Sequence, residues 1–190
     1  MQKIIIFASG SGSNAENIIQ YFETTSTKSV VGIFSNNSNA KVLERAAKWQ
    51  VPTVVFSKQE LPTASFLEKI NAFAPDLIVL AGFLLKLPES IIKHYSNKII
   101  NIHPALLPKY GGKGMYGIHV HQAVLENNEK ETGITIHYVN EQYDEGEFVF
   151  QQSVNIEDCK TSEEIAKKVL ELEHNYFPKV IDDLLTSNEH

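Results

Sequence analysis

The amino-acid sequence predicts an α/β protein with a doubly wound, mostly parallel twisted sheet and an antiparallel addition at one edge. Short apolar segments alternate with segments of helical periodicity through the first hundred residues, which is the pattern of strand–helix–strand units. Residues 4–7 and 77–80 are continuously apolar, as strands covered on both faces are. Residues 132–139 alternate between two faces, which favours an antiparallel strand instead.

Five strands and three helices are expected in the first part of the chain. The strands are residues 3–8, 29–34, 53–56, 77–81 and 98–102. The helices between them are residues 15–22, 42–48 and 65–73, and Pro75 follows as a stop signal. Crossovers between parallel strands are right-handed, so this alternation implies a doubly wound sheet.

The second part of the chain is expected to add an antiparallel pair at the sheet edge. A short helix at residues 119–126 precedes two strands, residues 132–139 and 148–154. A long helix then follows at residues 161–185.

This last helix has a recognisable start. Thr161 and Glu164 have the spacing of a capping box, and Pro178 is expected to kink or divide the helix. We therefore expect a single domain over residues 1–185, with residues 186–190 as a frayed tail.

Composition excludes several classes of protein. The chain has 190 residues, 43% of them hydrophobic and 21% charged, which suits one globular domain. A net charge of −6 argues against nucleic-acid binding, which usually needs a basic face. The single cysteine, Cys159, cannot form an internal disulfide, which favours a reducing compartment. No segment is long enough for a signal-peptide core or a membrane span, so we expect a cytoplasmic monomer or homodimer that binds small molecules.

A glycine-rich turn directly follows the first predicted strand. Its sequence, Ser-Gly-Ser-Gly-Ser-Asn at residues 9–14, opens a helix whose free N–H groups and dipole favour an anion. The spacing also fits the relaxed dinucleotide fingerprint, but residues 34–37 supply no acidic residue for a ribose. A phosphate monoester is therefore favoured over NAD, and a tight turn without a ligand is the alternative.

Polar residues also end the fifth predicted strand. Asn101 and His103 are two positions apart, so both point to the same face. An amide and an imidazole there can stabilise an oxyanion and move a proton. The alternative is a histidine that simply bonds to the backbone at a strand end.

Asp144 lies in the loop between the two late strands. If it lies near His103, its charge raises the pKa of the imidazole and keeps it protonated. A solvated turn is the commoner role for this type of loop.

The remaining histidines are weak candidates for metal ligands. His103, His119, His121 and His137 show no closed zinc spacing, so no metal is expected. The glycine-rich residues 111–117 predict a flexible loop, and the alternative is a lid over the site at the end of the fifth predicted strand.

With these motifs, the sequence resembles the phosphoribosylglycinamide formyltransferases, a family of folate-dependent enzymes of purine synthesis. The resemblance covers nearly the whole chain. It rests on residues 9–14, on Ala-Gly-Phe at 81–83, on Asn-Ile-His-Pro at 101–104 with Leu-Leu-Pro-Lys-Tyr at 106–110, and on Asp144 with Gly146. It implies the formyltransferase fold, 10-formyltetrahydrofolate as the formyl donor and no metal.

The resemblance also implies roles for individual residues. The catalytic residues are Asn101, His103 and Asp144. The substrate-binding residues are Gly12, Ser13 and Asn14 for the phosphate and Glu173 for the ribose. The folate-binding residues are Leu84, Leu85, Lys86, Leu87, Asn101 and Asn140, and the loop at 140–144 closes the folate pocket.

The implied reaction transfers the formyl group to the amine of 5'-phosphoribosylglycinamide in de novo synthesis of IMP. Asn101 and protonated His103 stabilise a tetrahedral intermediate, and Asp144 keeps His103 charged. Methionyl-tRNA formyltransferase and formyltetrahydrofolate hydrolase fit less well, because each needs an additional domain. A sugar-nucleotide formyltransferase and a non-catalytic nucleotide-binding module remain alternatives.

Overall fold

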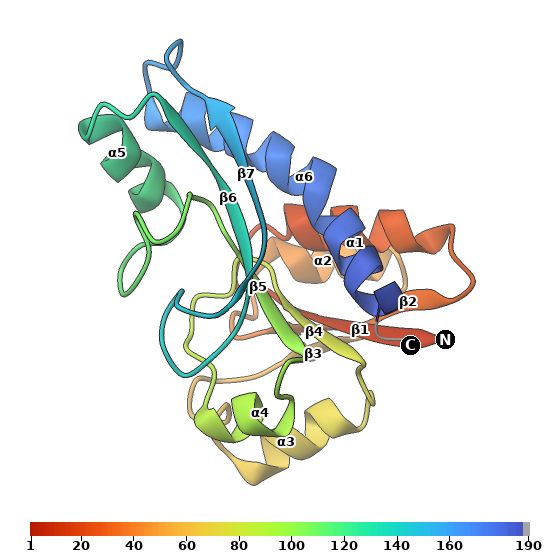
Figure 1. Cartoon of the computed structure of the whole chain (residues 1–190). Coiled ribbons are helices and arrows are strands. Elements are labelled where there is room, and N and C mark those ends of the chain that lie inside the picture. The colour runs from red at the N-terminus through yellow and green to blue at the C-terminus, as the bar shows by residue number, and fades with distance from the viewer. Residues whose placement is uncertain (188–190) are drawn as a thin grey trace.

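The structure, a computed structural model, describes residues 1–187. These residues form one seven-stranded sheet of order β3-β2-β1-β4-β5-β6-β7 (Figure 1). The strands are β1 (Gln2–Phe7), β2 (Lys28–Ser35), β3 (Thr53–Val55), β4 (Leu77–Leu80), β5 (Ile99–His103), β6 (Glu131–Tyr138) and β7 (Phe148–Asn155). The first five strands are parallel, and β6 and β7 are antiparallel additions. The predicted fold class is thus confirmed.

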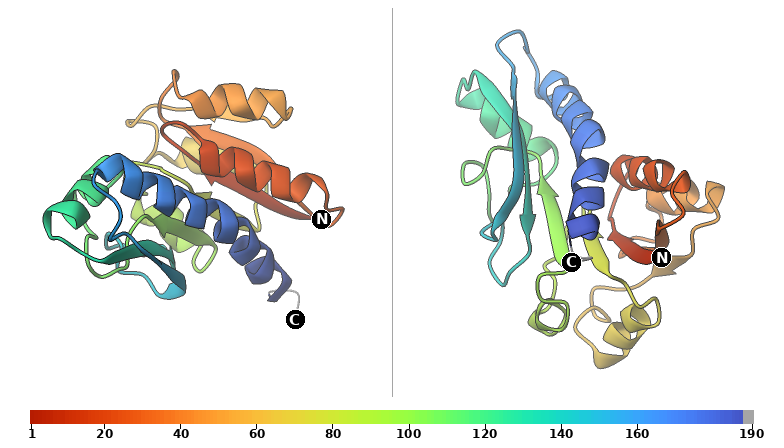
Figure 2. Two further views of the ribbon diagram at one scale, coloured as in Figure 1. Left: turned by 90° about the horizontal axis from the view of Figure 1, so that it is seen from above. Right: turned by 45° about the vertical axis from the view of Figure 1, so that its right-hand side comes forward.

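Helices cover both faces of this sheet. They are α1 (Ser13–Glu23), α2 (Lys41–Lys48), α3 (Ala64–Asn71), α4 (Glu89–His94), α5 (Ile118–Glu126) and α6 (Ser162–Ser187). Helices α1, α2 and α6 lie on one face, and α3 and α4 lie on the other (Figures 1 and 2). Each face has its own cluster of buried apolar side chains. The residues of β1 alternate between the two, since Ile4 and Ile6 belong to one cluster and Ile5 and Phe7 to the other.

The junction of the parallel and antiparallel parts lies between β5 and β6. Their register sets Asn101 opposite His137 and His103 opposite Thr135. Strand β6, which the sequence predicts only as an addition at the sheet edge, therefore supplies the polar residues that lie beside the end of β5.

Helix α6 is longer than the sequence predicts. Pro178 lies inside the helix, so of the two expected effects, a kink or a division, the division does not occur. The helix also includes Thr186 and Ser187, two residues of the expected tail, while residues 188–190 lie outside the described part. The capping box is confirmed, because the Glu164 N–H donates to Thr161 Oγ1 at 3.2 Å and the Thr161 N–H donates to Glu164 Oε2 at 3.2 Å. Within residues 1–187, no helix combines the length and apolar character that crossing a membrane requires.

Candidate active site

One cavity of about 730 Å³ lies where several polar segments meet. The carboxyl ends of β1, β4 and β5 open into it, as is usual for ligand sites in open α/β sheets. Its lining consists of residues 10–14, 80–87, 92, 101–104, 112–118, 121, 137, 139–140, 142–144 and the α6 residues Ala166, Val169, Leu170 and Glu173. The residues that the sequence assigns to catalysis, phosphate and folate therefore border a single cavity.

The turn after β1 presents backbone N–H groups to this cavity. Gly12 is the N-cap residue of α1 and has a φ of 72°, which disfavours other residues. A Cβ at Gly12 would come within 2.5 Å of Val42 Cβ, so the start of α1 lies too close to α2 for any side chain at this position. Ser13 and Asn14 occupy the first turn of α1, where backbone N–H groups have no partner within the helix. This arrangement suits a phosphate.

Asn14 and Glu173 meet although they are far apart in the sequence. Asn14 Nδ2 donates to Glu173 Oε2 at 2.7 Å. Burial raises the pKa of the Glu173 carboxyl to about 7, although the hydrogen bond from Asn14 opposes the shift. Asn14 Oδ1 is buried and has no partner among residues 1–187. The pair therefore offers unsatisfied hydrogen-bonding capacity on the cavity wall next to the turn after β1.

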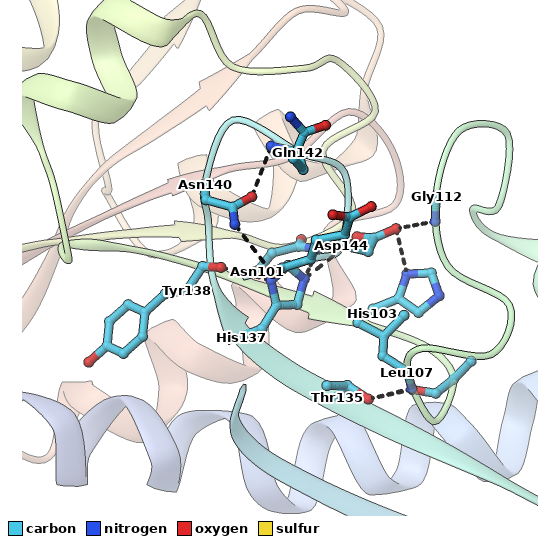
Figure 3. Close-up of polar contacts among 12 residues, drawn as sticks. Asn101, His103, Leu107, Gly112, Thr135, His137, Tyr138, Asn140, Gln142 and Asp144 are labelled. Carbon is cyan, nitrogen blue, oxygen red and sulfur yellow. Dashed lines mark hydrogen bonds and ion pairs between the residues drawn. The ribbon is translucent and has the colours of Figure 1, made fainter. Parts of the chain in front are cut away.

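His103 lies at the end of β5 and is almost fully buried, with 3% of its surface exposed. Its Nε2 lies 2.7 Å from the carbonyl oxygen of Tyr110, and its Nδ1 lies 3.6 Å from Asp144 Oδ2 (Figure 3). A nitrogen that faces a carbonyl must carry a proton, so Nε2 is the protonated nitrogen of the neutral ring. A second proton would be placed on Nδ1, beside the carboxylate.

The expected protonation of His103 needs a correction. Burial lowers the pKa of His103 below its ordinary value, and the nearby His137 lowers it as well. The charge of Asp144 and the hydrogen bond to Tyr110 raise the pKa but do not offset the burial. The sequence-based hypothesis gave the effect of Asp144 the right sign and left out burial, which lowers the pKa of His103 in the free protein.

Asp144 is held by two partners besides His103. The Gly112 N–H donates to Asp144 Oδ2 at 2.9 Å, and His137 Nε2 lies 3.6 Å from Asp144 Oδ1 (Figure 3). Burial alone would raise the pKa of Asp144, but the interactions with His137, His103 and the Gly112 N–H outweigh it and leave the pKa below its ordinary value. Asp144 is thus ionised at neutral pH and ties the glycine-rich loop to the end of β5.

The sequence reasoning missed the role of His137. Asn101 Nδ2 lies 3.2 Å from His137 Nε2, and His137 Nδ1 lies 2.9 Å from the carbonyl oxygen of Tyr138. His137 Nε2 thus lies between the Asn101 amide group and the Asp144 carboxylate, so His137 links the two side chains. The alternation of β6 places Thr135 and His137 on one face, but only the register with β5 shows that this face meets Asn101.

Thr135 was also missed, and it supports the turn after His103. Thr135 Oγ1 donates to the carbonyl oxygen of Ala105 at 2.7 Å and accepts from the Leu107 N–H at 3.0 Å (Figure 3). The Leu107–Pro108 peptide bond in this turn is cis. These contacts direct the chain away from the sheet and back to Tyr110, whose carbonyl meets His103.

The predicted folate segment forms another wall. The Ser9 hydroxyl accepts from the Leu84 N–H at 3.0 Å, which joins this wall to the turn after β1. Lys86 Nζ lies 5.3 Å from the centre of the Tyr143 ring, so the segment after β4 contacts the loop after β6. Leu84 is half exposed and Leu87 is buried in the core. Asn140 stabilises its own loop by accepting from the Gln142 N–H and donating to the carbonyl oxygen of Glu145.

The described residues contain no group of three or more histidine, cysteine, aspartate or glutamate side chains arranged to hold a metal ion. Three of the four histidines that the sequence offered as ligands have other neighbours. His103 and His137 lie beside Asp144, while His119 is exposed and its ring is perpendicular to that of Tyr116.

A parallel sheet that brings an amide, an imidazole and a carboxylate into one ligand cavity is the arrangement of an α/β enzyme. The model of the family described as formyl transferase matches residues 2–181, and the chain belongs to this family of one-carbon transferases. The chain is 34% identical to the phosphoribosylglycinamide formyltransferase of Bacillus subtilis, over 99% of this chain and 97% of that protein. It is 37% identical to the chloroplastic phosphoribosylglycinamide formyltransferase of Arabidopsis thaliana over 95% of this chain, and it spans 64% of that protein.

A solved structure with the same name agrees in fold. The crystal structure of phosphoribosylglycinamide formyltransferase from Bacillus halodurans has a TM-score of 0.88 and 32% identity, with 97% of this chain and 95% of that chain covered. The resemblance inferred from the four motifs is therefore confirmed.

Proposed function

We propose that the protein transfers the formyl group of 10-formyltetrahydrofolate to the amine of 5'-phosphoribosylglycinamide, as a step of de novo purine synthesis in the cytoplasm. The observation that carries the proposal is that Asn101, His103 and Asp144 border the same cavity as the glycine-rich turn and the segment at residues 84–87. A turn suited to a phosphate, side chains suited to acyl transfer and an apolar wall therefore border one cavity, which supports the proposal.

The two substrates would enter this chamber from different walls. The turn at residues 12–14 suits the phosphate of the ribonucleotide, and the buried Glu173 beside Asn14 suits the ribose hydroxyls. Residues 84–87 and 140–143 suit the folate, because they combine apolar surface with backbone groups and the cation of Lys86. Holding both substrates in register supplies much of the rate acceleration.

The chemistry then needs one bond formed and one broken. The amine nitrogen of the ribonucleotide attacks the formyl carbon, and the carbonyl oxygen becomes an oxyanion. The amide of Asn101, oriented by His137, donates to this oxyanion. The bond between the formyl carbon and N10 of the folate then breaks, and the proton lost by the amine reaches N10.

His103 is suited to carry this proton because burial lowers the pKa of its imidazole, which favours the form that accepts a proton. Its Nδ1 can accept the proton of the attacking amine, either directly or through a water molecule. Asp144, 3.6 Å from Nδ1, stabilises the imidazolium that results. The proton is then available for N10. The low pKa of free His103 therefore favours a shuttle role over that of a permanently charged group.

The direct test is an assay with purified protein, a 10-formyl folate and glycinamide ribonucleotide. Turnover is followed by the change in folate absorbance, and the formylated ribonucleotide is identified by mass spectrometry. We expect turnover with this acceptor and none with glycinamide that lacks the ribose phosphate. A folded protein that gives no product with glycinamide ribonucleotide would overturn the proposal and direct attention to sugar-nucleotide amines as acceptors.

A further inference from the structure

His121 is a buried polar residue of the cavity that the proposed chemistry does not use. It lies in α5 with 6% of its surface exposed, and it lines the same cavity as His103 and Glu173. Its Nδ1 is sealed from solvent and has no hydrogen-bond partner among residues 1–187. Nε2 is not one of these fully buried atoms without a partner, so it is the nitrogen that a ligand in the cavity can reach.

The ring is neutral under ordinary conditions. Burial and the nearby His103 lower the pKa of His121 to about 4. A neutral imidazole has one N–H and one lone pair, and an unpaired buried N–H is the more costly group to leave unsatisfied. The favoured tautomer therefore has its lone pair on the sealed Nδ1 and its N–H on Nε2, facing the cavity.

An apolar side chain would fill this position without leaving a nitrogen unpaired. The imidazole thus lowers the stability of the free protein. A buried polar atom without a partner is expected where a side chain contacts a ligand. The donor that faces the cavity calls for an oxygen acceptor, such as a hydroxyl, a phosphate oxygen or a carbonyl.

The position of α5 indicates which substrate supplies the oxygen. Helix α5 packs against α6, and α6 carries Val169, Leu170 and Glu173 on the cavity wall. The folate segments, residues 84–87 and 140–143, come from the ends of β4 and β6 and belong to other walls. Helix α5, which carries His121, therefore lies on the α6 side of the cavity, and α6 also carries the buried Glu173 with its partner Asn14.

We propose that His121 is a further substrate-contacting residue, whose Nε2–H donates a hydrogen bond to an oxygen of the phosphoribosyl group. The proposal rests on the proposed function, because it takes the ribonucleotide as the ligand of this wall. It adds a binding contact and no chemical step, so it predicts a change in KM for one substrate only.

The test compares three variants. His121→Leu removes the donor, His121→Gln places an amide N–H near the position of Nε2, and His119→Leu is the control for an exposed histidine two residues away that does not line the cavity. We expect His121→Leu to raise KM for glycinamide ribonucleotide about tenfold, with kcat and the folate KM within about threefold of wild type. His121→Gln should recover part of the loss, and His119→Leu should resemble wild type. An unchanged ribonucleotide KM in a folded His121→Leu variant would overturn the assignment.

A second measurement needs no variant at all. In the wild-type protein with ¹⁵N-labelled histidine, saturating ribose 5-phosphate should shift the ring signals of His121 and leave those of His119 in place. An unshifted His121 signal at saturation would refute the contact even if the variants fail to fold. Because this titration needs no formyl transfer, its result is distinct from a failure of wild-type turnover, which would refute the proposed function instead.

Discussion

The ends of β1 and β5 face the same cavity but build their sites from different groups. After β1, the proposed anion site consists of backbone N–H groups at the start of α1, and its shape is set by one local glycine, Gly12. At the end of β5, the site consists of side chains, and each is held by residues from β6, from the glycine-rich loop or from the loop at residues 140–144. The first site is local in sequence, and the second exists only when four segments meet.

This difference predicts different responses to substitution. Backbone donors survive a change of side chain, so single substitutions near Gly12 should weaken substrate binding moderately. Side chains at the end of β5 have no substitutes within the described cavity, so their loss should lower kcat strongly.

Removal of the central groups should nearly abolish turnover. We expect His103→Ala and Asn101→Ala each to lower kcat by roughly 10³-fold, because each removes an oxyanion donor or a proton carrier from a buried site. The exposed His94 provides the control, and His94→Ala should keep wild-type activity. Steady-state kinetics and thermal unfolding together check the result. Either central variant with wild-type kcat would remove the assignment of the end of β5 as the reaction centre.

Asp144→Asn should lower kcat less than the loss of His103 or Asn101, through a change in the pKa of His103 that can be measured. The charge of Asp144 is the largest influence that raises the pKa of His103. Its removal should lower that pKa further and reduce kcat by roughly 10²-fold, because the imidazolium formed during transfer loses its counter-charge. An NMR titration of His103 measures the pKa directly, with Asp158→Asn on the protein surface as the control. A higher pKa of His103 in Asp144→Asn would contradict the proposed electrostatics.

Substitutions at the turn after β1 should affect one substrate only. We expect the double change Ser13→Ala and Asn14→Ala to raise KM for glycinamide ribonucleotide about tenfold and to leave the folate KM unchanged, because the backbone N–H groups remain. Initial rates measured against each substrate in turn separate the two constants. Ser26→Ala, in an exposed loop, is the control. An equal rise in both KM values would mean that the turn shapes the whole cavity and does not specifically hold the phosphate.

Glu173→Gln should stabilise the free protein as it weakens substrate binding. The pKa of Glu173 is raised to about 7 in the folded protein, above its value of about 4.5 in the unfolded chain. The stability linked to its protonated form is therefore complete below pH 4.5 and is lost as the pH rises through 7. At pH 8 the variant should gain about 2–3 kcal/mol in free energy of unfolding, and at pH 4 it should gain almost nothing. Urea unfolding at both pH values measures the gain, and an equal gain at both would contradict the raised pKa.

The same contrast explains how much the sequence revealed. The continuous apolar strands, the helices between them and the capping box at Thr161 are local patterns, and each appears in the structure close to its expected bounds. The short helix α4 was not expected, since its six residues provide too little periodicity to detect. The glycine-rich turn needs only its neighbours in the chain, so its place at the start of α1 was evident from the order of residues.

The side-chain contacts at the end of β5 could only partly be predicted from the sequence. Asn101 and His103 could be assigned to one face of a strand because side chains alternate with a period of two. Their partners could not be assigned, because the register of β6 against β5 decides that His137 meets Asn101, and loop packing decides that Asp144 approaches His103. The direction in which the pKa of His103 shifts could be inferred only from the tertiary structure. A pKa reflects burial as well as neighbouring charge, and burial is a property of the assembled fold.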